Sequence, residues 1–286
     1  MKLARFGPIG AERPALVDRH GKLRDASALV SDISMDAISA LEGIDPESLP
    51  LADADARIGV PLSGIGKFIA IGLNYTDHAA ESGMEAPAEP IIFMKAISCL
   101  GGPYDDVPLP LGSKTMDWEL ELGVVIGKRA RYIGEAEALD HVAGYVLVND
   151  LSERFDQHQR GGSWDKGKGH DGFGPVGPWL VTRDELGDAS GLAMTLDVNG
   201  IRRQDGNSRD MIFNVAAIVA YVSRFFTLMP GDLIATGTPA GVGGGIKPEP
   251  VFLKEGDEIR ARIEGLGEQR QRIVASPWQV NRPEQA

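Results

Sequence analysis

The sequence has a single cysteine, Cys99, and no long apolar run. One cysteine excludes an intramolecular disulfide and a cysteine-rich zinc site. No activating motif stands beside Cys99, so we expect it to be a packing residue. The opening residues MKLARFGPIGAERP contain no apolar stretch of signal-peptide length, and no window approaches the roughly 20 apolar residues of a membrane helix. These absences predict a cytoplasmic protein that does not bind membranes.

Basic residues are also scarce. There are 29 Lys and Arg against 41 Asp and Glu, which gives a formal net charge of -12. Acidic and basic residues are dispersed along the chain, and no run of Lys or Arg is present. Sequence-independent electrostatic binding to nucleic acid or to an anionic membrane is therefore disfavoured. Small molecules are the better class of partner.

The chain is long enough for one large domain, or for a large domain with a small appendage. It has 286 residues, of which 43% are hydrophobic. We predict a small N-terminal domain at residues 1-60, with strands at 2-6 and 15-17 and a weakly periodic stretch at 34-41. Residues 61-286 would form the second and larger domain, and the polar tail after Ser276 would be peripheral.

Short strand-like runs separated by glycine and proline dominate the larger domain. They lie at residues 68-73, 91-94, 120-126, 144-149, 179-182, 194-198, 233-236 and 258-264. Apolar residues recur at helical spacing over residues 208-228, where Ser208 would be the N-cap. A shorter helix would follow residue 73, capped by Asn74 or Thr76. The fold class is therefore α+β and mostly β.

Three acidic residues are candidate metal ligands. Glu119 and Glu121 are two residues apart in a strand pattern, which places both side chains on one face. Asp150 ends the apolar run 142-149, where a strand end delivers a side chain into a pocket. Carboxylates in a partly buried site repel one another unless a cation lies between them, and an all-oxygen set favours Mg2+, Mn2+ or Ca2+ over zinc. Two solvent-facing glutamates on an edge strand would give the same spacing.

Two further motifs carry groups suited to catalysis. His78 and Glu81 are three residues apart in the short predicted helix, so the carboxylate can orient the imidazole as a base. Lys168 lies in the glycine-rich segment WDKGKGHDGFGP, where it can meet an anionic oxygen. The segment TGTPAGVGGG, which contains Thr238, follows a strand and offers hydroxyls and backbone amides suited to a carboxylate. Each motif also occurs on ordinary surfaces and turns.

Taken in order, five segments resemble the catalytic domain of the fumarylacetoacetate hydrolase family. They are NYTDHAAE, DWELELGVVIGK, VNDLSERFDQ, WDKGKGHDGFGPVGPW and PGDLIATGTPAGVG. The resemblance covers roughly residues 67-267. It implies a mixed β-roll catalytic domain, often assembled as a homodimer, that holds Mg2+ or Mn2+ through Glu119, Glu121 and Asp150, with Ca2+ as a further occupant.

The resemblance also implies roles for other residues. His78 and Glu81 match the family's acid/base pair on a lid segment, and Lys168 matches the lysine that stabilises the enolate oxygen of the substrate. The positions that match substrate contacts are Arg154, Gln157 and Thr238. The reaction implied is hydrolysis of the C-C bond of a 2,4-dioxo acid.

The sequence departs from the pattern of the original hydrolase in one respect. Ile71 and Gly72 lie where the larger enzyme has an additional aspartate ligand. This favours the smaller, acylpyruvase-like branch and disfavours fumarylacetoacetate as the substrate. Segments 167-171, 203-207 and 263-269 resemble enzymes that cleave 2,4-dioxo-3-deoxy sugar acids and sequences named ureidoglycolate lyase. A lyase, a 2-oxo acid isomerase or tautomerase, an oxaloacetate decarboxylase and a non-catalytic binding module stay open as alternatives.

Overall fold

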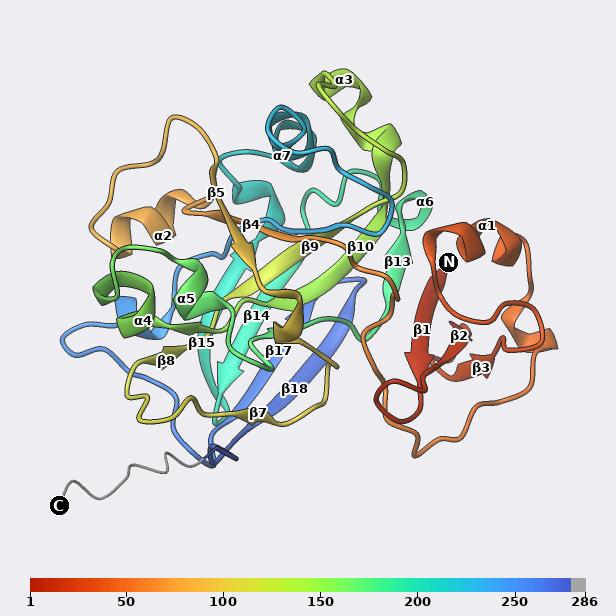
Figure 1. The fold of residues 1–286 in the computed structure, drawn as a ribbon, viewed down its shortest axis with the longest axis horizontal. Helices are drawn as coiled ribbons and strands as arrows, with labels where there is room; N and C mark the ends of the chain where they lie inside the picture. The colour runs from red at the N-terminus through yellow and green to blue at the C-terminus, as the bar shows by residue number, and fades with distance from the viewer. Residues whose placement is uncertain (279–286) are drawn as a thin grey trace, which may run out of the picture.

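The computed structural model describes residues 1-278 and is built on a nine-stranded sheet (Figure 1). In hydrogen-bonding order its strands are β3 (Leu23–Asp25), β2 (Arg13–Val17), β1 (Lys2–Phe6), β13 (Leu180–Thr182), β10 (Val142–Asn149), β9 (Leu120–Ile126), β16 (Leu233–Ala235), β4 (Phe68–Gly72) and β5 (Ile91–Lys95). Only the β16-β4 pair is parallel; the others are antiparallel.

The central strands β9 and β10 are covered on both faces. All seven residues of β9 are buried, so its sequence is a continuous apolar run interrupted by Glu121 and Gly123 rather than an alternating one. A Cβ atom at Gly144 of β10 would overlap the backbone of Val181 on the neighbouring strand. Glycine at this position therefore permits the close approach of β13 to β10.

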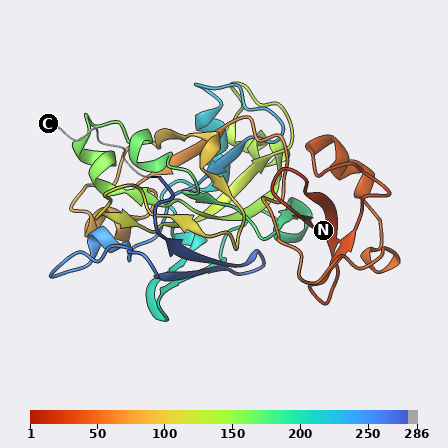
Figure 2. The ribbon, with the colours of Figure 1, turned by 60° about the horizontal axis from the view of Figure 1, so that its bottom comes forward.

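A second, five-stranded sheet packs against β9 and β10. Its order is β15 (Ile201–Asn207), β14 (Ala193–Val198), β17 (Glu258–Ile263), β18 (Gly267–Val274) and β7 (Val107–Pro108). Figure 2 shows β15, β14, β17 and β18, in cyan and blue, beneath the yellow and green strands of the large sheet. Buried and exposed residues alternate along β17 and β18, as expected for strands with one face toward the core.

The sequence did not predict β15 and β18, because several of their inward-facing residues are polar. Gln204, Gln269 and Gln271 are buried. Each amide is satisfied: Gln269, for example, donates to the carbonyls of Leu147 and Gly177 at 2.9 and 3.0 Å. A polar residue at a core position is tolerated when its hydrogen bonds are made, but it removes the apolar alternation by which a strand is recognised.

Short elements complete the fold. Two further strand pairs are β6 (Leu100–Gly101) with β12 (Gly174–Pro175) and β8 (Met116–Asp117) with β11 (Ser152–Glu153). The α-helices are α1 (Met35–Leu41), α2 (Thr76–Glu81), α3 (Glu135–Ala138), α4 (Arg154–Gln159), α5 (Asp165–Lys168), α6 (Arg183–Leu186) and α7 (Val215–Val222); the 3-10 helices are η1 (Pro46–Ser48), η2 (Ile97–Cys99), η3 (Leu139–His141), η4 (Ser208–Asp210) and η5 (Gly243–Gly245). Helices α2, α4 and α5 gather at one end of the molecule (Figure 1).

The first 60 residues lie at the opposite side of the molecule (Figure 1). Strand β1 pairs with β13 through Lys2 and Leu3, so the N-terminal strands extend the large sheet. They also enclose a small apolar cluster of their own, which includes Ala4, Phe6 and Ala15. The boundary near residue 60 stays a prediction.

The long helix predicted at residues 208-228 is wrong in its extent. The chain forms η4 and then α7, with Asn214 rather than Ser208 as the N-cap of the α-helix. Between the two helices, the amides of Ile212 and Phe213 donate to the backbone carbonyl and side-chain oxygen of Asn74. These tertiary hydrogen bonds replace helical ones, so the apolar spacing continues where the helix does not.

The predicted cap of α2 is wrong for the same reason. Tyr75 is the N-cap residue, and no side chain makes a capping hydrogen bond there. The Asn74 amide instead donates to the carbonyls of Thr236 and Phe213, at 2.7 and 3.0 Å. Asn74 therefore joins three segments of the chain and does not cap the helix.

Cys99 is fully buried, and burial raises the pKa of its thiol to about 11. This agrees with the predicted packing role. Among the described residues, no helix combines the length and apolar character needed to cross a membrane. Most of the tail predicted to be peripheral falls at 279-286, outside the described residues.

Candidate active site

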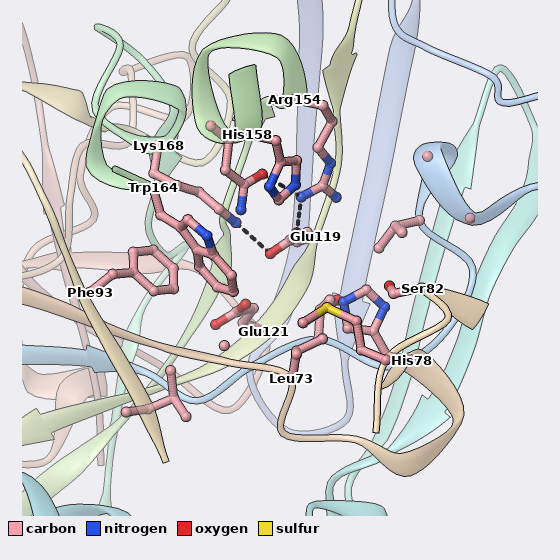
Figure 3. Close-up of a pocket in the computed structure, with 18 of the residues that line it drawn as sticks. Leu73, His78, Ser82, Phe93, Glu119, Glu121, Arg154, His158, Trp164 and Lys168 are labelled. Atoms are coloured by element: carbon pink, nitrogen blue, oxygen red, sulfur yellow. Dashed lines mark hydrogen bonds and ion pairs between the residues drawn. The ribbon is translucent and has the colours of Figure 1, made fainter. Parts of the chain in front are cut away.

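Glu119, Glu121 and Asp150 meet where β9 begins and β10 ends. The two strands run antiparallel, and the Asp150 amide donates to the Glu119 carbonyl at 2.8 Å, which brings the start of one strand to the end of the other. Each of the three buried residues offers a carboxylate oxygen, and these oxygens lie within 4.8 Å of one another. Figure 3 shows Glu119 and Glu121 facing the same cavity.

Lys168 joins two of the carboxylates. Its Nζ lies 2.7 Å from Glu119 Oε2 (Figure 3). The same nitrogen lies 2.8 Å from Asp150 Oδ2. Burial alone would lower the pKa of this lysine, but the charges of Asp150 and Glu119 outweigh burial and raise it. Lys168 therefore carries its positive charge inside the site. In turn, Lys168 and Arg154 lower the pKa of Glu119 in spite of its burial.

Glu121 has no such cationic partner among the residues that the structure describes. It accepts one hydrogen bond, from the Gly237 amide at 2.8 Å. Burial and the charges of Asp150 and Glu119 raise the pKa of Glu121 well above its usual value. This repulsion is what a divalent cation would relieve, and three hard oxygen donors fit Mg2+ or Mn2+. The residues present therefore fit the metal that the sequence predicts.

A second buried lysine, which the sequence reasoning missed, holds the other side of Asp150. Lys95 of β5 places its Nζ 2.5 Å from Asp150 Oδ1, and this ammonium also donates to the backbone carbonyl of Lys168. A lone lysine at the end of the apolar run IIFMK gives no sequence signal of this role. Its position depends on the pairing of β5 with β4 at the sheet edge.

Arg154, at the start of α4, links the carboxylate cluster to the segment TGTPAGVGGG, called the glycine-rich loop below. Its guanidinium lies 2.6 Å from Glu119 Oε1 and 2.8 Å from Asp117 Oδ2. Asp117, also missed in the sequence, accepts from the amides of Gly243 and Gly244 at 2.6 and 2.9 Å. One guanidinium nitrogen, Nη2, is buried without a hydrogen-bond partner in the described part of the chain. A buried unpaired donor of this kind suits an anionic ligand.

His78 and Glu81 form the predicted pair on α2. His78 Nδ1 lies 2.9 Å from Glu81 Oε1, which leaves Nε2 of the buried ring for other chemistry. The Glu81 carboxylate also accepts the Gly241 amide at 3.0 Å. Glu81 therefore orients His78 and fixes α2 to the glycine-rich loop.

The Thr238 hydroxyl is already engaged. It donates to the Leu120 carbonyl at 2.8 Å and accepts the Gln204 amide at 2.7 Å. Gln157 differs: its oxygen accepts from Arg154 at 3.1 Å, while its NH2 group makes no hydrogen bond within the described residues. Gln157 thus offers a donor to a ligand, whereas Thr238 presents mainly its backbone and methyl group.

A cavity of about 360 Å³ brings most of the predicted residues together. Those that line it are His78, Glu119, Glu121, Arg154, Gln157, Lys168 and Thr238. Asp150 and Glu81 stand behind this wall, in contact with Lys168 and His78. The cavity also includes side chains for which the sequence gave no functional signal: Leu73, Ser82, Met84, Phe93, His158, Trp164, Val242 and Phe252. The site combines fixed cations, an acidic cluster and an oriented imidazole around one cavity.

Comparison with known proteins places this geometry in context. The family model described as fumarylacetoacetate (FAA) hydrolase C-terminal matches residues 67–274. A curated relative, 2,4-didehydro-3-deoxy-L-rhamnonate hydrolase of Sphingomonas sp. (strain SKA58), is 57% identical over 278 residues, which are 97% of this chain and 97% of the relative.

Solved structures share the fold over nearly the whole chain. Fumarylacetoacetate hydrolase from Exiguobacterium antarcticum superposes with a TM-score of 0.85 at 35% identity, covering 96% of this chain and 99% of its own. The 2-hydroxyhepta-2,4-diene-1,7-dioate isomerase from Mycobacterium marinum has a TM-score of 0.74 at 32% identity and covers 97% and 100%. The resemblance inferred from the five segments is therefore confirmed, and so is the predicted fold class.

Proposed function

The chain belongs to the fumarylacetoacetate hydrolase family, and on that premise we propose that it is a Mg2+- or Mn2+-dependent hydrolase that cleaves the C-C bond of a 2,4-dioxo acid. The observation that carries the proposal is the cavity in which the acidic cluster, Lys168 and the His78-Glu81 pair face one another. The name of the 57% identical relative supports a 2,4-dioxo-3-deoxy sugar acid as the substrate class.

Glu119, Glu121 and Asp150 would hold the metal. A bound divalent cation supplies Lewis acidity, which polarises a carbonyl oxygen and stabilises negative charge that develops on it. To hold a metal as well, the Glu119 carboxylate would share its charge with Lys168, 2.7 Å from Oε2, and with Arg154, 2.6 Å from Oε1. All three carboxylates are buried, so the charge of a bound cation would be weakly screened by solvent.

The substrate carboxylate meets a prepared set of donors. Arg154 offers the buried, unpaired Nη2, and Gln157 offers its free NH2 group. Asp117 and Glu119 fix the guanidinium, so little side-chain entropy is lost when a ligand binds. The 2-oxo acid end of the substrate would therefore bind at the polar wall of the cavity.

His78 would transfer the proton, and Lys168 would stabilise the negative charge that develops on the substrate. His78, with Nδ1 held by Glu81, takes a proton from water at Nε2, and the water oxygen attacks the 4-oxo carbon. The C3-C4 bond then breaks, and its electron pair becomes the enolate of pyruvate. The ammonium of Lys168 stabilises the enolate oxygen, and protonation at C3 gives pyruvate and the carboxylic acid of the acyl part.

Steady-state assays test the proposal directly. Acylpyruvates and 2,4-dioxo-3-deoxy sugar acids would be supplied with Mg2+, while diketone absorbance and pyruvate release are followed for the wild type and Glu119→Ala. Pyruvate release that depends on Mg2+ and is lost in the variant supports the proposal. If the protein binds metal but cleaves no diketone, the hydrolase assignment is rejected; a ureidoglycolate lyase, an oxaloacetate decarboxylase and a non-catalytic module are then compared.

An isomerase is the second candidate, because one of the solved relatives carries that name. The same His78 and Lys168 can move a proton beside a stabilised enolate without breaking a C-C bond. Loss of the diketone absorbance with no pyruvate would identify this reaction. We also propose, from the family resemblance, that the protein is a homodimer, which light scattering of the purified protein tests.

A further inference from the structure

Polar and apolar side chains share the lining of the cavity. The acidic cluster and its cations form one part of it, and Phe93, Trp164, Met84 and Phe252 are among the apolar side chains. The Lys168 ammonium lies 5.2 Å from the centre of the Phe93 ring, so the apolar part adjoins the cations. Two polar side chains, His158 and Ser82, interrupt the apolar part. The acyl part of a substrate, beyond the 4-oxo carbon, therefore meets carbon surfaces and few hydrogen-bonding groups.

His158 is held in a defined position on this wall. It lies on α4 four residues after Arg154, so both side chains are on the helix face toward the cavity. Its ring packs edge-on against Trp164, with ring centroids 6.1 Å apart and an interplanar angle of 83°. Trp164 in turn packs against Phe93 at 5.4 Å. Figure 3 shows the His158 ring on the Arg154 side of the cavity.

The ring nitrogens of His158 are available to a ligand. Neither nitrogen makes a hydrogen bond to another residue in the described part of the chain, and the residue is exposed toward the cavity. Partial burial and the charges of Arg154 and Lys168 lower the pKa of His158, so the ring is neutral at neutral pH. A neutral imidazole offers one N-H donor and one acceptor, the pair of functions that a hydroxyl group matches.

We propose that His158 is a specificity-determining residue that hydrogen-bonds a hydroxyl group on the acyl part of a 2,4-dioxo-3-deoxy sugar acid. The inference rests on the proposed function. It adds the residue that recognises the hydroxyl group by which a sugar acid differs from a plain acylpyruvate. Trp164 and Met84 contact the remaining carbon atoms of the acyl part. Lys168 is paired with two carboxylates, and the free nitrogen of Arg154 is assigned above to the substrate carboxylate, which leaves His158 to contact the acyl part.

Two substrates that differ by one hydroxyl group test the proposal: 5-hydroxy-2,4-dioxohexanoate and 2,4-dioxohexanoate. The variant His158→Phe retains an aromatic ring against Trp164 and removes both nitrogens, whereas His158→Gln restores a donor and an acceptor. Gln159→Ala, the adjacent exposed residue of α4, is the matched control because it does not line the cavity. The readout is the ratio of kcat/KM for the two substrates.

We expect His158→Phe to lower kcat/KM for the hydroxylated substrate about tenfold, mainly through KM, and to leave the other substrate nearly unchanged. His158→Gln should retain most of the preference, and Gln159→Ala all of it. An equal loss on both substrates, or no loss on either, overturns the proposal. If the wild type cleaves neither substrate, the proposed function fails and this inference with it; wild-type cleavage of both at equal rates rejects the inference alone.

Discussion

Lys95 Nζ lies 2.5 Å from Asp150 Oδ1, on the side of the carboxylate opposite the oxygen that Lys168 contacts. Both lysines are buried, so the Asp150 carboxylate is fixed between two ammonium groups inside the protein. A carboxylate held in this way keeps one orientation whether or not a ligand is present. Lys95 thus contributes to the site without lining the cavity.

Removing Lys95 should destabilise the fold. In Lys95→Met the buried Asp150 loses one of its two cationic partners, and breaking a buried ion pair typically costs about 3 to 5 kcal/mol. Urea denaturation with EDTA present measures the difference in the free energy of unfolding. Lys254→Met, at an exposed position, serves as the control. A loss below about 1 kcal/mol for Lys95→Met would contradict the structural importance of the pair.

His78→Gln should lower kcat by roughly 10²- to 10⁴-fold, the usual contribution of a general base. The affinity for Mn2+ should change little, because the proposed metal ligands are the three carboxylates and the recorded partner of His78 is Glu81. Steady-state kinetics and calorimetric titration with Mn2+ measure the two quantities separately. Wild-type turnover in this variant would remove His78 from the mechanism.

Glu81→Gln should affect catalysis and the glycine-rich loop together. The neutral amide no longer stabilises a protonated His78, so we expect kcat to fall by about 10- to 100-fold. The Gly241 amide also exchanges its carboxylate acceptor for a neutral amide oxygen, which is a weaker acceptor. Hydrogen exchange of the segment 241-245 should therefore become faster than in the wild type. Unchanged exchange there would show that Glu81 does not hold the loop to α2.

The N-terminal residues contain a pH-sensitive contact. Hydrogen bonding by the Lys22 amide and by Arg24 lowers the pKa of Asp18 to about 2, from the usual 3.8. Because the pKa is lowered on folding, the contact stabilises the protein fully above pH 3.8, and this stabilisation is lost as the pH falls toward 2. Asp18→Asn should therefore be less stable than the wild type at pH 6, with a smaller difference at pH 3.

Denaturation midpoints at the two pH values test this expectation. Asp55→Asn, at an exposed position, is the control and should match the wild type at both pH values. A difference between Asp18→Asn and wild type that stays constant from pH 6 to pH 3 would contradict the assigned cause.

The sequence predicts the parts of this site that depend on local spacing. Glu119 and Glu121 converge because they flank one strand position, and His78 meets Glu81 because they are three residues apart in a helix. Residues that reach the site through long-range pairing had no local signal. Lys95 is an example, since its position depends on the pairing of β5 with β4 at the sheet edge.

The same distinction explains the errors in the fold. Asn74 has a side chain suited to a helix cap, but its partners are the distant residues Phe213 and Thr236. The buried glutamines of β15 and β18 remove the apolar alternation by which these strands could be recognised in the sequence. The partners that satisfy their hydrogen bonds come from distant segments of the core. Tertiary hydrogen bonds overrode the local preference in each case.

Glu121→Gln tests the metal site most directly. Within the described residues Glu121 has no cationic partner, so the substitution breaks no ion pair whose loss would itself change stability. Mn2+ affinity and Mg2+-dependent pyruvate release would be measured beside the wild type, with a denaturation curve of the metal-free protein. We predict unreduced stability of the metal-free variant, at least tenfold weaker Mn2+ binding and loss of pyruvate release. Wild-type metal affinity and turnover in Glu121→Gln would contradict the claim that this cluster is the metal site of the enzyme.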